Sequence, residues 1–193
     1  MPLKLHVVIH GAGAAFIRQP GCPCVRCAEP VLPEQPTPQD LADLLAWARQ
    51  AHTSASLVIE DDGVAVDHTL IDCGMGVVDN LAALPTPARN QPIHRVLVTH
   101  GHLDHIAGLD PLMYALDMAR IAGDFAQDEQ PWPLPVWTTR HTWERYIGPN
   151  PRDPADGGFL RRAHDRLSFT DITDAALALA ALEPHPALLV TPI

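Results

Sequence analysis

The chain has 193 residues, of which 47% are hydrophobic, as is typical of a single globular domain with a sizeable core. The formal net charge of −10 disfavours a nucleic-acid polymer as partner, because such binding requires clustered Lys and Arg. The chain contains no apolar run of about 18 residues or more, and its N-terminus lacks the basic segment of a signal peptide. We therefore expect a cytoplasmic protein that does not act at a membrane.

The first part of the chain combines strands with one clear helix. Residues 3–13 predict a strand that ends in a glycine turn, and residues 37–52 predict a helix with Thr37 as its N-cap. Residues 54–61 and 64–74 predict two strands joined by a turn with the sequence Asp-Asp-Gly. The alternation of strands and helices along the chain indicates the α/β class.

Strands and helices continue to alternate in the remaining sequence. The expected helices cover residues 77–85, 105–119, 140–147 and 158–166, and the expected strands cover 94–100, 133–139 and 185–193. The strand over 94–100 is apolar enough to be buried on both faces.

The sequence THGHLDH (99–105) places His100, His102, Asp104 and His105 directly after a predicted buried strand. Alternation along an extended segment sends the first two histidines to the same side, and the last two residues begin a helix on a neighbouring face. Such an arrangement can present two donors to each of two divalent ions, which lie roughly 3.5–4 Å apart in dinuclear hydrolases. Mixed nitrogen and oxygen donors suit zinc, with manganese possible. The alternative is a histidine-rich surface loop, but α/β sites gather at such strand ends.

Three cysteines, Cys22, Cys24 and Cys27, lie close together in a proline-rich segment. A tight cluster in a cytosolic chain more often holds a metal ion than forms disulfides. Three thiolates are one ligand short of tetrahedral zinc, and the spacing leaves open that they are reduced cysteines without metal. The fourth cysteine, Cys73, is expected to be a small core residue.

Several of these motifs resemble one family. THGHLDH resembles the signature His-x-His-x-Asp-His of the metallo-β-lactamase fold, and TLIDCG resembles its strand whose terminal aspartate, here Asp72, lies beneath the metal site. GCPCVRC, close behind HGAGAA, is similar to the cyclic-phosphate phosphodiesterases of bacterial phosphonate degradation. It is less similar to the pyrroloquinoline-quinone biosynthesis B proteins. The resemblance covers nearly the whole chain and implies a hydrolase acting on a phosphodiester.

The resemblance also implies roles for individual residues. The ligands of a zinc or manganese centre would be His100, His102, Asp104 and His105. Asp104 would also be the catalytic carboxylate, and Asp72 would orient a ligand without binding the metal itself. The ligands of a separate structural zinc would be Cys22, Cys24 and Cys27.

The family supplies further metal ligands beyond a strand that resembles LLVTPI, where this sequence ends at Ile193. We therefore expect residues 1–193 to form a single metallo-β-lactamase-like domain that is incomplete at its C-terminus. Its fold would be the first half of an αββα sandwich plus the start of the second half. His164 and His185 are expected to be linker or surface residues, whereas His10, at the end of the first strand, could lie beside the site. An isolated half would expose its sheet edge, so a homodimer is expected.

Four functions are compatible with these motifs. The leading hypothesis is a metal-dependent phosphodiesterase that acts on small cyclic phosphates or nucleotides through a dinuclear site. The second is a pyrroloquinoline-quinone biosynthesis B-like protein. A tRNA 3′-processing nuclease is disfavoured, because the sequence has no basic arm rich in glycine and proline. The last is a metal-binding fragment that lacks catalytic activity.

Overall fold

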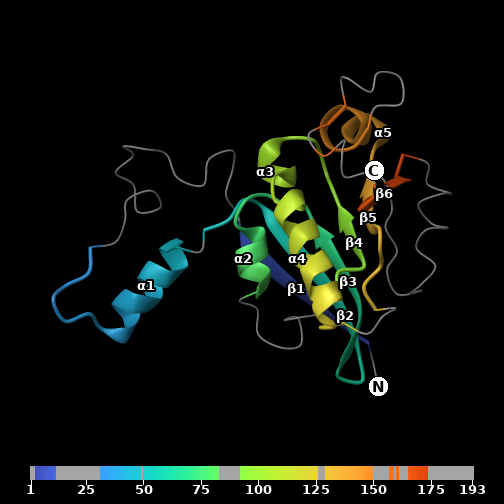
Figure 1. The fold of residues 1–193 in the computed structure, drawn as a ribbon. Coiled ribbons are helices and arrows are strands. Elements are labelled where there is room, and N and C mark those ends of the chain that lie inside the picture. The colour runs from blue at the N-terminus through green and yellow to red at the C-terminus, as the bar shows by residue number, and fades with distance from the viewer. Residues whose placement is uncertain are drawn as a thin grey trace.

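A computed structural model of the chain shows a six-stranded sheet with helices packed on one face (Figure 1). The structure describes residues 3–11, 31–48, 50–82, 92–125, 129–149, 157–158, 160 and 165–173. Several predictions fall outside these ranges, namely those for Cys22, Cys24, Cys27, His164, His185 and the strand over 185–193. In the part that is described, no helix is long and apolar enough to cross a membrane.

The six strands lie side by side in the order of the sequence. They are β1 (Lys4–Gly11), β2 (Ser54–Asp61), β3 (Val64–Ile71), β4 (Arg95–Leu97), β5 (Leu134–Thr138) and β6 (Leu167–Asp171). The first three strands pair antiparallel, and β3 to β6 pair parallel. This mixed sheet with its helices confirms the predicted α/β class.

The helices occupy the connections between strands. They are α1 (Pro38–Ala48), α2 (Val77–Ala82), α3 (Leu103–Ile106), α4 (Leu109–Ala122), α5 (Arg140–Thr142) and the π-helix η1 (Trp143–Ile147). Side chains of α2 and α4 pack on the sheet and form the main core with Leu70, Val96 and Val136. On the opposite face, β1 leaves Leu5 and Val7 exposed.

The hairpin between β2 and β3 forms as the sequence predicts. Asp62 and Gly63 occupy its turn with φ angles of 48° and 85°. Two consecutive residues with positive φ match the right-handed twist of a hairpin, and Asp-Gly is a favoured pair for such turns. The turn pairs Asp61 with Val64, and the register of the hairpin shifts once, between Ile59 and Glu60.

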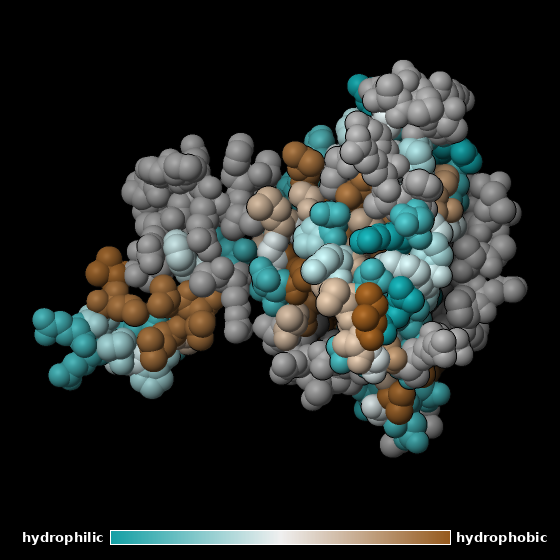
Figure 2. Space-filling view, viewed as in Figure 1, coloured by the Kyte–Doolittle hydropathy of each residue, from teal (hydrophilic) through white to brown (hydrophobic). Residues whose placement is uncertain are grey.

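Helix α1 also begins as predicted, but it lies apart from the sheet (Figure 1). The backbone N–H of Asp40 donates to Thr37 Oγ1 at 3.2 Å, and the backbone N–H of Thr37 donates to Asp40 Oδ2 at 2.8 Å. Leu41 and Leu45 remain 45% and 52% exposed. Hydrophobic residues are accordingly visible over α1 in Figure 2. The capping residues thus define the start of this helix without help from the core.

Two expectations differ from the structure. The helix expected over 105–119 is divided into α3 and α4 around Gly108, whose N–H donates to the carbonyl of Cys73 at 2.7 Å. A Cβ at this position would lie 2.2 Å from the carbonyl oxygen of Gly74, so only glycine permits this close approach. The stretch expected as a helix over 158–166 lies mostly outside the described residues, and an unexpected strand, β6, follows it.

We expect Gly123→Ala to lower the free energy of unfolding by about 1 kcal/mol. Gly123 ends α4 with a φ of 77°, and a Cβ there would meet no atom within 4 Å. The loss would therefore come from backbone conformation and not from a steric clash. Urea denaturation of Gly123→Ala and Gly123→Asn tests this, because asparagine tolerates the left-handed region better. An equal loss in both variants would contradict the explanation.

Candidate metal centre

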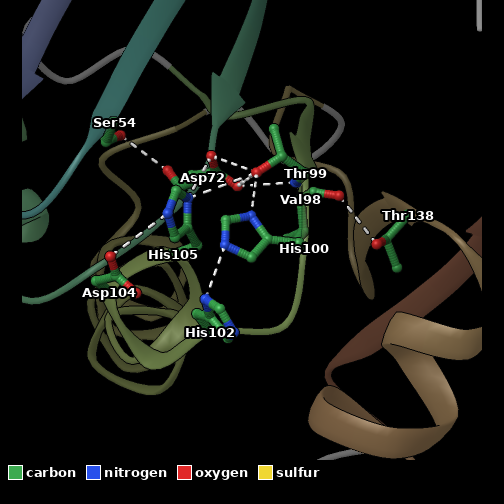
Figure 3. A network of polar contacts seen from close by, with 9 residues as sticks. All are labelled: Ser54, Asp72, Val98, Thr99, His100, His102, Asp104, His105 and Thr138. Atoms are coloured by element: carbon green, nitrogen blue, oxygen red, sulfur yellow. Dashed lines mark hydrogen bonds and ion pairs between the residues drawn. The ribbon is translucent and has the colours of Figure 1, made fainter. Parts of the chain in front are cut away.

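The predicted metal ligands lie at the carboxyl ends of the neighbouring parallel strands β3 and β4 (Figure 3). Asp72 directly follows β3, and Thr99 and His100 come shortly after β4. Because the two strands are parallel, both of these segments emerge at the same edge of the sheet. Ligand sites of open α/β sheets form at such carboxyl ends.

Asp72 is the most buried residue of this group and is fixed by several hydrogen bonds. It is 3% exposed and has a φ of 54°, a conformation that aspartate tolerates better than most residues. Its carboxylate accepts from the Thr99 backbone N–H at 2.8 Å and from the Thr99 hydroxyl at 2.9 and 3.0 Å. Its backbone carbonyl accepts from the Ser54 hydroxyl at 2.8 Å. The carboxylate therefore has a single defined position.

The Asp72 carboxylate in turn orients His105. His105 Nδ1 lies 2.8 Å from Asp72 Oδ2. An ionised carboxylate can only accept a hydrogen bond, so the neutral form of His105 carries its proton on Nδ1 and its electron pair on Nε2. In known metal sites, a histidine that binds the metal through one ring nitrogen often donates the N–H of its other ring nitrogen to a carboxylate. Nε2 of neutral His105 thus has an electron pair with which it could coordinate a cation.

The four candidate ligands form two pairs of donor atoms. His100 Nε2 lies 3.2 Å from His102 Nδ1, and His105 Nε2 lies 3.5 Å from Asp104 Oδ2. Two donors that bind one tetrahedral zinc at about 2.0–2.1 Å are separated by about 3.3–3.4 Å. The ring centroids of His100 and His105 are 3.9 Å apart, so the two pairs are adjacent. The spacing of both pairs suits a zinc-like cation.

The protonation of His100 also suits a metal ligand. Partial burial, together with the nearby imidazoles of His105 and His102, lowers the pKa of His100. The ring is consequently neutral at neutral pH, as metal binding requires. Its Nδ1 lies 3.0 Å from the hydroxyl of Thr99, so Nε2, which lies next to His102 Nδ1, is the ring nitrogen that would bind a cation.

Each donor pair is only part of a complete site. Within the ranges that the structure describes, no three His, Cys, Asp or Glu side chains converge on one metal position. Catalytic zinc sites in proteins have at least three protein ligands. The described residues therefore offer two pairs of candidate ligands, and neither pair alone completes a metal site.

The structure brings together the five residues predicted for this centre, namely Asp72, His100, His102, Asp104 and His105. Their roles remain predictions. His10, which the sequence allows to lie beside the site, has its Nε2 2.7 Å from Ser56 Oγ. Sequence analysis missed Thr99, although its hydroxyl joins Asp72 to His100. The sequence placed Thr99 only near the end of an expected strand, and a threonine at such a position carries no signal for this role.

Comparison with known sequences places these residues in a family. The metallo-beta-lactamase superfamily matches residues 49–165, more than half of the chain, including Asp72 and the histidine cluster. Ribonuclease Z of Bradyrhizobium sp. (strain ORS 278) is 42% identical over 53 residues, which are 28% of this chain and 17% of that protein. Coenzyme PQQ synthesis protein B of Methylorubrum populi (strain ATCC BAA-705 / NCIMB 13946 / BJ001) is 30% identical over 115 residues, 54% of this chain and 32% of that protein.

Solved structures show distant similarity. A diphosphatase from the PhnP family has a TM-score of 0.48 at 19% identity, over 89% of this chain and 52% of that one. Zn²⁺-bound PqqB from Methylobacterium extorquens has a TM-score of 0.42 at 22% identity, over 72% of this chain and 38% of that one. The chain thus spans about half, or less, of these proteins. The match over residues 49–165 shows that the chain belongs to the metallo-beta-lactamase superfamily.

Proposed function

We propose that this chain is part of a metal-dependent phosphodiesterase that acts on small cyclic phosphates or nucleotides. The observation that carries the proposal is the pairing of four metal donors, with His105 held by Asp72 at 2.8 Å. In this superfamily, a relative of part of the chain is named as a ribonuclease, an enzyme class that cleaves phosphodiesters. A small substrate fits the net charge of −10, which repels a long polyanion.

The residues of the site have distinct tasks in this proposal. His100 and His102 hold one cation, and Asp104 and His105 hold the other. Bound divalent ions supply Lewis acidity toward a phosphoryl group. Asp72 keeps His105 in the tautomer that leaves Nε2 free, and the Thr99 hydroxyl keeps Asp72 in place. The three cysteines remain candidate ligands for a separate structural zinc.

A second candidate is a role like that of the coenzyme PQQ synthesis protein B, which aligns with 54% of this chain. The same donors would then support an oxidation instead of a hydrolysis. The two candidates differ in their need for an oxidant. Hydrolysis of a cyclic phosphate in the absence of oxygen would exclude the second candidate as the explanation of that activity.

The first test is metal content per chain, measured by elemental mass spectrometry on protein purified without added metal or chelator. We expect about two equivalents of zinc or manganese at the paired donors, and a third if the cysteines bind zinc. His102→Ala should lose about one equivalent, whereas His141→Ala, a change at an exposed histidine outside the site, should lose none.

The second test is hydrolysis of a 2′,3′-cyclic nucleotide by the same three proteins. We expect His102→Ala to lower the rate by at least about 100-fold, because loss of a ligand exceeds the 10–100-fold effect of changes around metal ligands. His141→Ala should retain the wild-type rate. Hydrolysis that is equally fast in the two variants would refute the proposed function.

A further inference from the structure

The aromatic ring of Tyr146 lies against the turn that carries two of the candidate metal ligands. Gly101 separates His100 from His102 in the sequence and is buried, whereas His102 is exposed. The three atoms nearest to a Cβ built on Gly101 all belong to Tyr146, with Cδ2 at 2.1 Å, Cγ at 2.3 Å and Cβ at 2.8 Å. The side chain of Tyr146 therefore occupies the space that any side chain at position 101 would require.

This contact, and not the backbone conformation, explains why position 101 is a glycine. Among the described glycines, those with a positive φ are Gly63, Gly76 and Gly123, so the φ of Gly101 does not lie in the region that favours glycine. An alanine there would place its methyl group inside the ring of Tyr146. The turn and the ring can approach each other because Gly101 has no side chain.

The segment that carries Tyr146 is anchored in the main core. Trp143 and Ile147, which flank it in η1, are both buried members of that core. The ring of Trp143 stacks on Phe169 of β6 with 5.2 Å between the ring centroids, and the carbonyl of Ile147 accepts from the Leu160 N–H at 2.9 Å. Tyr146 thus has a support that does not depend on the histidine turn.

The hydrogen bonds of Asp72 hold the residues on either side of the two ligands, namely Thr99 and His105. His102 is the first residue before α3, and its side chain forms no capping hydrogen bond there. Its ring faces that of His100, with 3.2 Å between His102 Nδ1 and His100 Nε2 and 4.7 Å between the ring centroids (Figure 3). The relative position of the two rings consequently depends on the backbone between them.

We propose that Tyr146 is a positioning residue for the metal centre. Its ring holds Gly101 in place, so that His100 and His102 keep the separation that one cation requires. Without the ring, the glycine backbone would be free to rotate and the two imidazoles would move apart. The inference rests on the proposed function because that function assigns a cation to this pair, but it does not depend on the substrate.

His141 also contacts Tyr146, with 6.0 Å between the ring centroids. Both residues belong to the continuous segment formed by α5 and η1, so this contact does not tie the ring to the histidine turn. The proposal is therefore consistent with His141→Ala as a variant that keeps its metal.

NMR of the metal-free chain tests the positioning directly. In the wild type we expect NOEs between the rings of His100 and His102, because their centroids are 4.7 Å apart. Tyr146→Phe keeps the three atoms that contact Gly101 and should keep these NOEs, whereas Tyr146→Ala removes the ring and should lose them. NOEs that persist in a folded Tyr146→Ala variant, or that are absent in the wild type, would overturn the proposal. This measurement requires no metal, so its outcome is separate from that of the proposed function.

Competition with a chromophoric chelator for Zn²⁺ measures the consequence for metal binding. We expect Tyr146→Ala to lower the zinc affinity by at least about 10-fold, the lower end of the effect of residues that orient metal ligands. Tyr146→Phe should bind as the wild type does, and so should Tyr114→Ala, the same change at a 64% exposed position on α4. Equal affinity in Tyr146→Ala and the wild type, or no zinc binding by the wild type, would overturn the role in metal binding. A wild type that binds zinc as expected but hydrolyses no cyclic phosphate would refute the proposed function and leave the positioning intact.

Gly101→Ala tests the same contact from the other side and keeps the proposal falsifiable if Tyr146→Ala does not fold. Its methyl group would displace the ring, so the NOEs and the zinc affinity should be lost as in Tyr146→Ala. Gly123→Ala is the matched control, since a Cβ at that position meets no atom within 4 Å, and it should retain both. NOEs and affinity that are unchanged in Gly101→Ala would overturn the proposal. If neither variant folds, absence of NOEs between Gly101 and the Tyr146 ring in the wild type would overturn it.

Discussion

Asp72→Asn is expected to lower the metal affinity of the chain by about 10–100-fold. The Asp72 carboxylate accepts the Nδ1 proton of His105 at 2.8 Å, and an asparagine amide in its place would present a donor to that nitrogen. His105 would then move its proton to Nε2, which is the nitrogen that faces Asp104. The electron pair needed for the cation would be lost although every ligand is still present.

Two measurements follow this change. Competition with a chromophoric chelator gives the metal affinity, and the ¹⁵N shifts of the His105 ring report the tautomer in the absence of metal. Asp62→Asn is the matched control, since Asp62 also has a positive φ, 48°, but lies exposed in the β2–β3 turn. An unchanged tautomer of His105 in Asp72→Asn would contradict the role assigned to Asp72, even if no metal binds.

Asp72→Ala separates orientation from stability. Alanine removes the acceptor of the Thr99 N–H and of the His105 Nδ1–H, and each lost hydrogen bond at these partly buried positions contributes about 0.5–1.5 kcal/mol. Asp72→Asn keeps an oxygen for Thr99 and should lose much less stability. Equal losses of unfolding free energy in the two variants would show that the hydrogen bonds to Thr99 contribute little.

The sequence predicts the features of this fold that depend on neighbouring residues. The Asp62-Gly63 turn fixes the hairpin because its two positive φ angles are a local preference. The start of α1 is visible because Thr37 and Asp40 cap each other within one helical turn. The histidine cluster is also local, since its four ligands lie within six consecutive positions.

Features that depend on distant residues were not predictable in the same way. Strand β6 alternates polar Ser168 and Thr170 with apolar residues, and it is a strand because it pairs with β5 along its whole length. The break at Gly108 follows from its contact with the carbonyl of Gly74, which is far away in sequence. The contact of Asp72 with His105 spans 33 positions, and only the family resemblance suggested it.

The contacts of the buried residues His10 and His68 with Ser56 also depend on residues that are distant in sequence. Nothing near His10 or His68 in sequence indicates that they share Ser56, because the three residues lie on β1, β3 and β2 respectively. Strand pairing brings them together within the sheet, where all three side chains are buried. Their burial has a consequence for stability that can be measured.

We expect the free energy of unfolding to fall by about 3 kcal/mol per buried histidine as the pH is lowered from 7 to 4. In the folded chain His10 and His68 have pKa values of about 4, compared with 6.5 for an unperturbed histidine. Between these values the unfolded chain binds more protons than the folded chain. The contribution to stability is therefore complete above pH 6.5 and is lost as the pH falls toward 4.

The cause of the shift is burial, to which smaller charge effects are added. His10, His94 and Arg95 lower the pKa of His68 further, and Asp67 opposes them. Asp67 is already paired with Arg95 at 2.6 Å, so its charge does little to stabilise a protonated His68. A proton on either ring would have to enter a buried environment in which the ring's hydrogen-bond partner is the neutral Ser56 hydroxyl. The folded chain consequently excludes it until the pH approaches 4.

Urea denaturation of the wild type at several pH values between 7 and 4 measures this loss. His68→Phe removes one of the two titrating rings, so its stability should fall by about 3 kcal/mol less over the same range. His141→Phe makes the same substitution at an exposed position and should keep the wild-type pH dependence. A wild-type stability that is constant over this range would mean that the folded and unfolded chains take up protons equally. Burial would then not lower the pKa of His10 and His68.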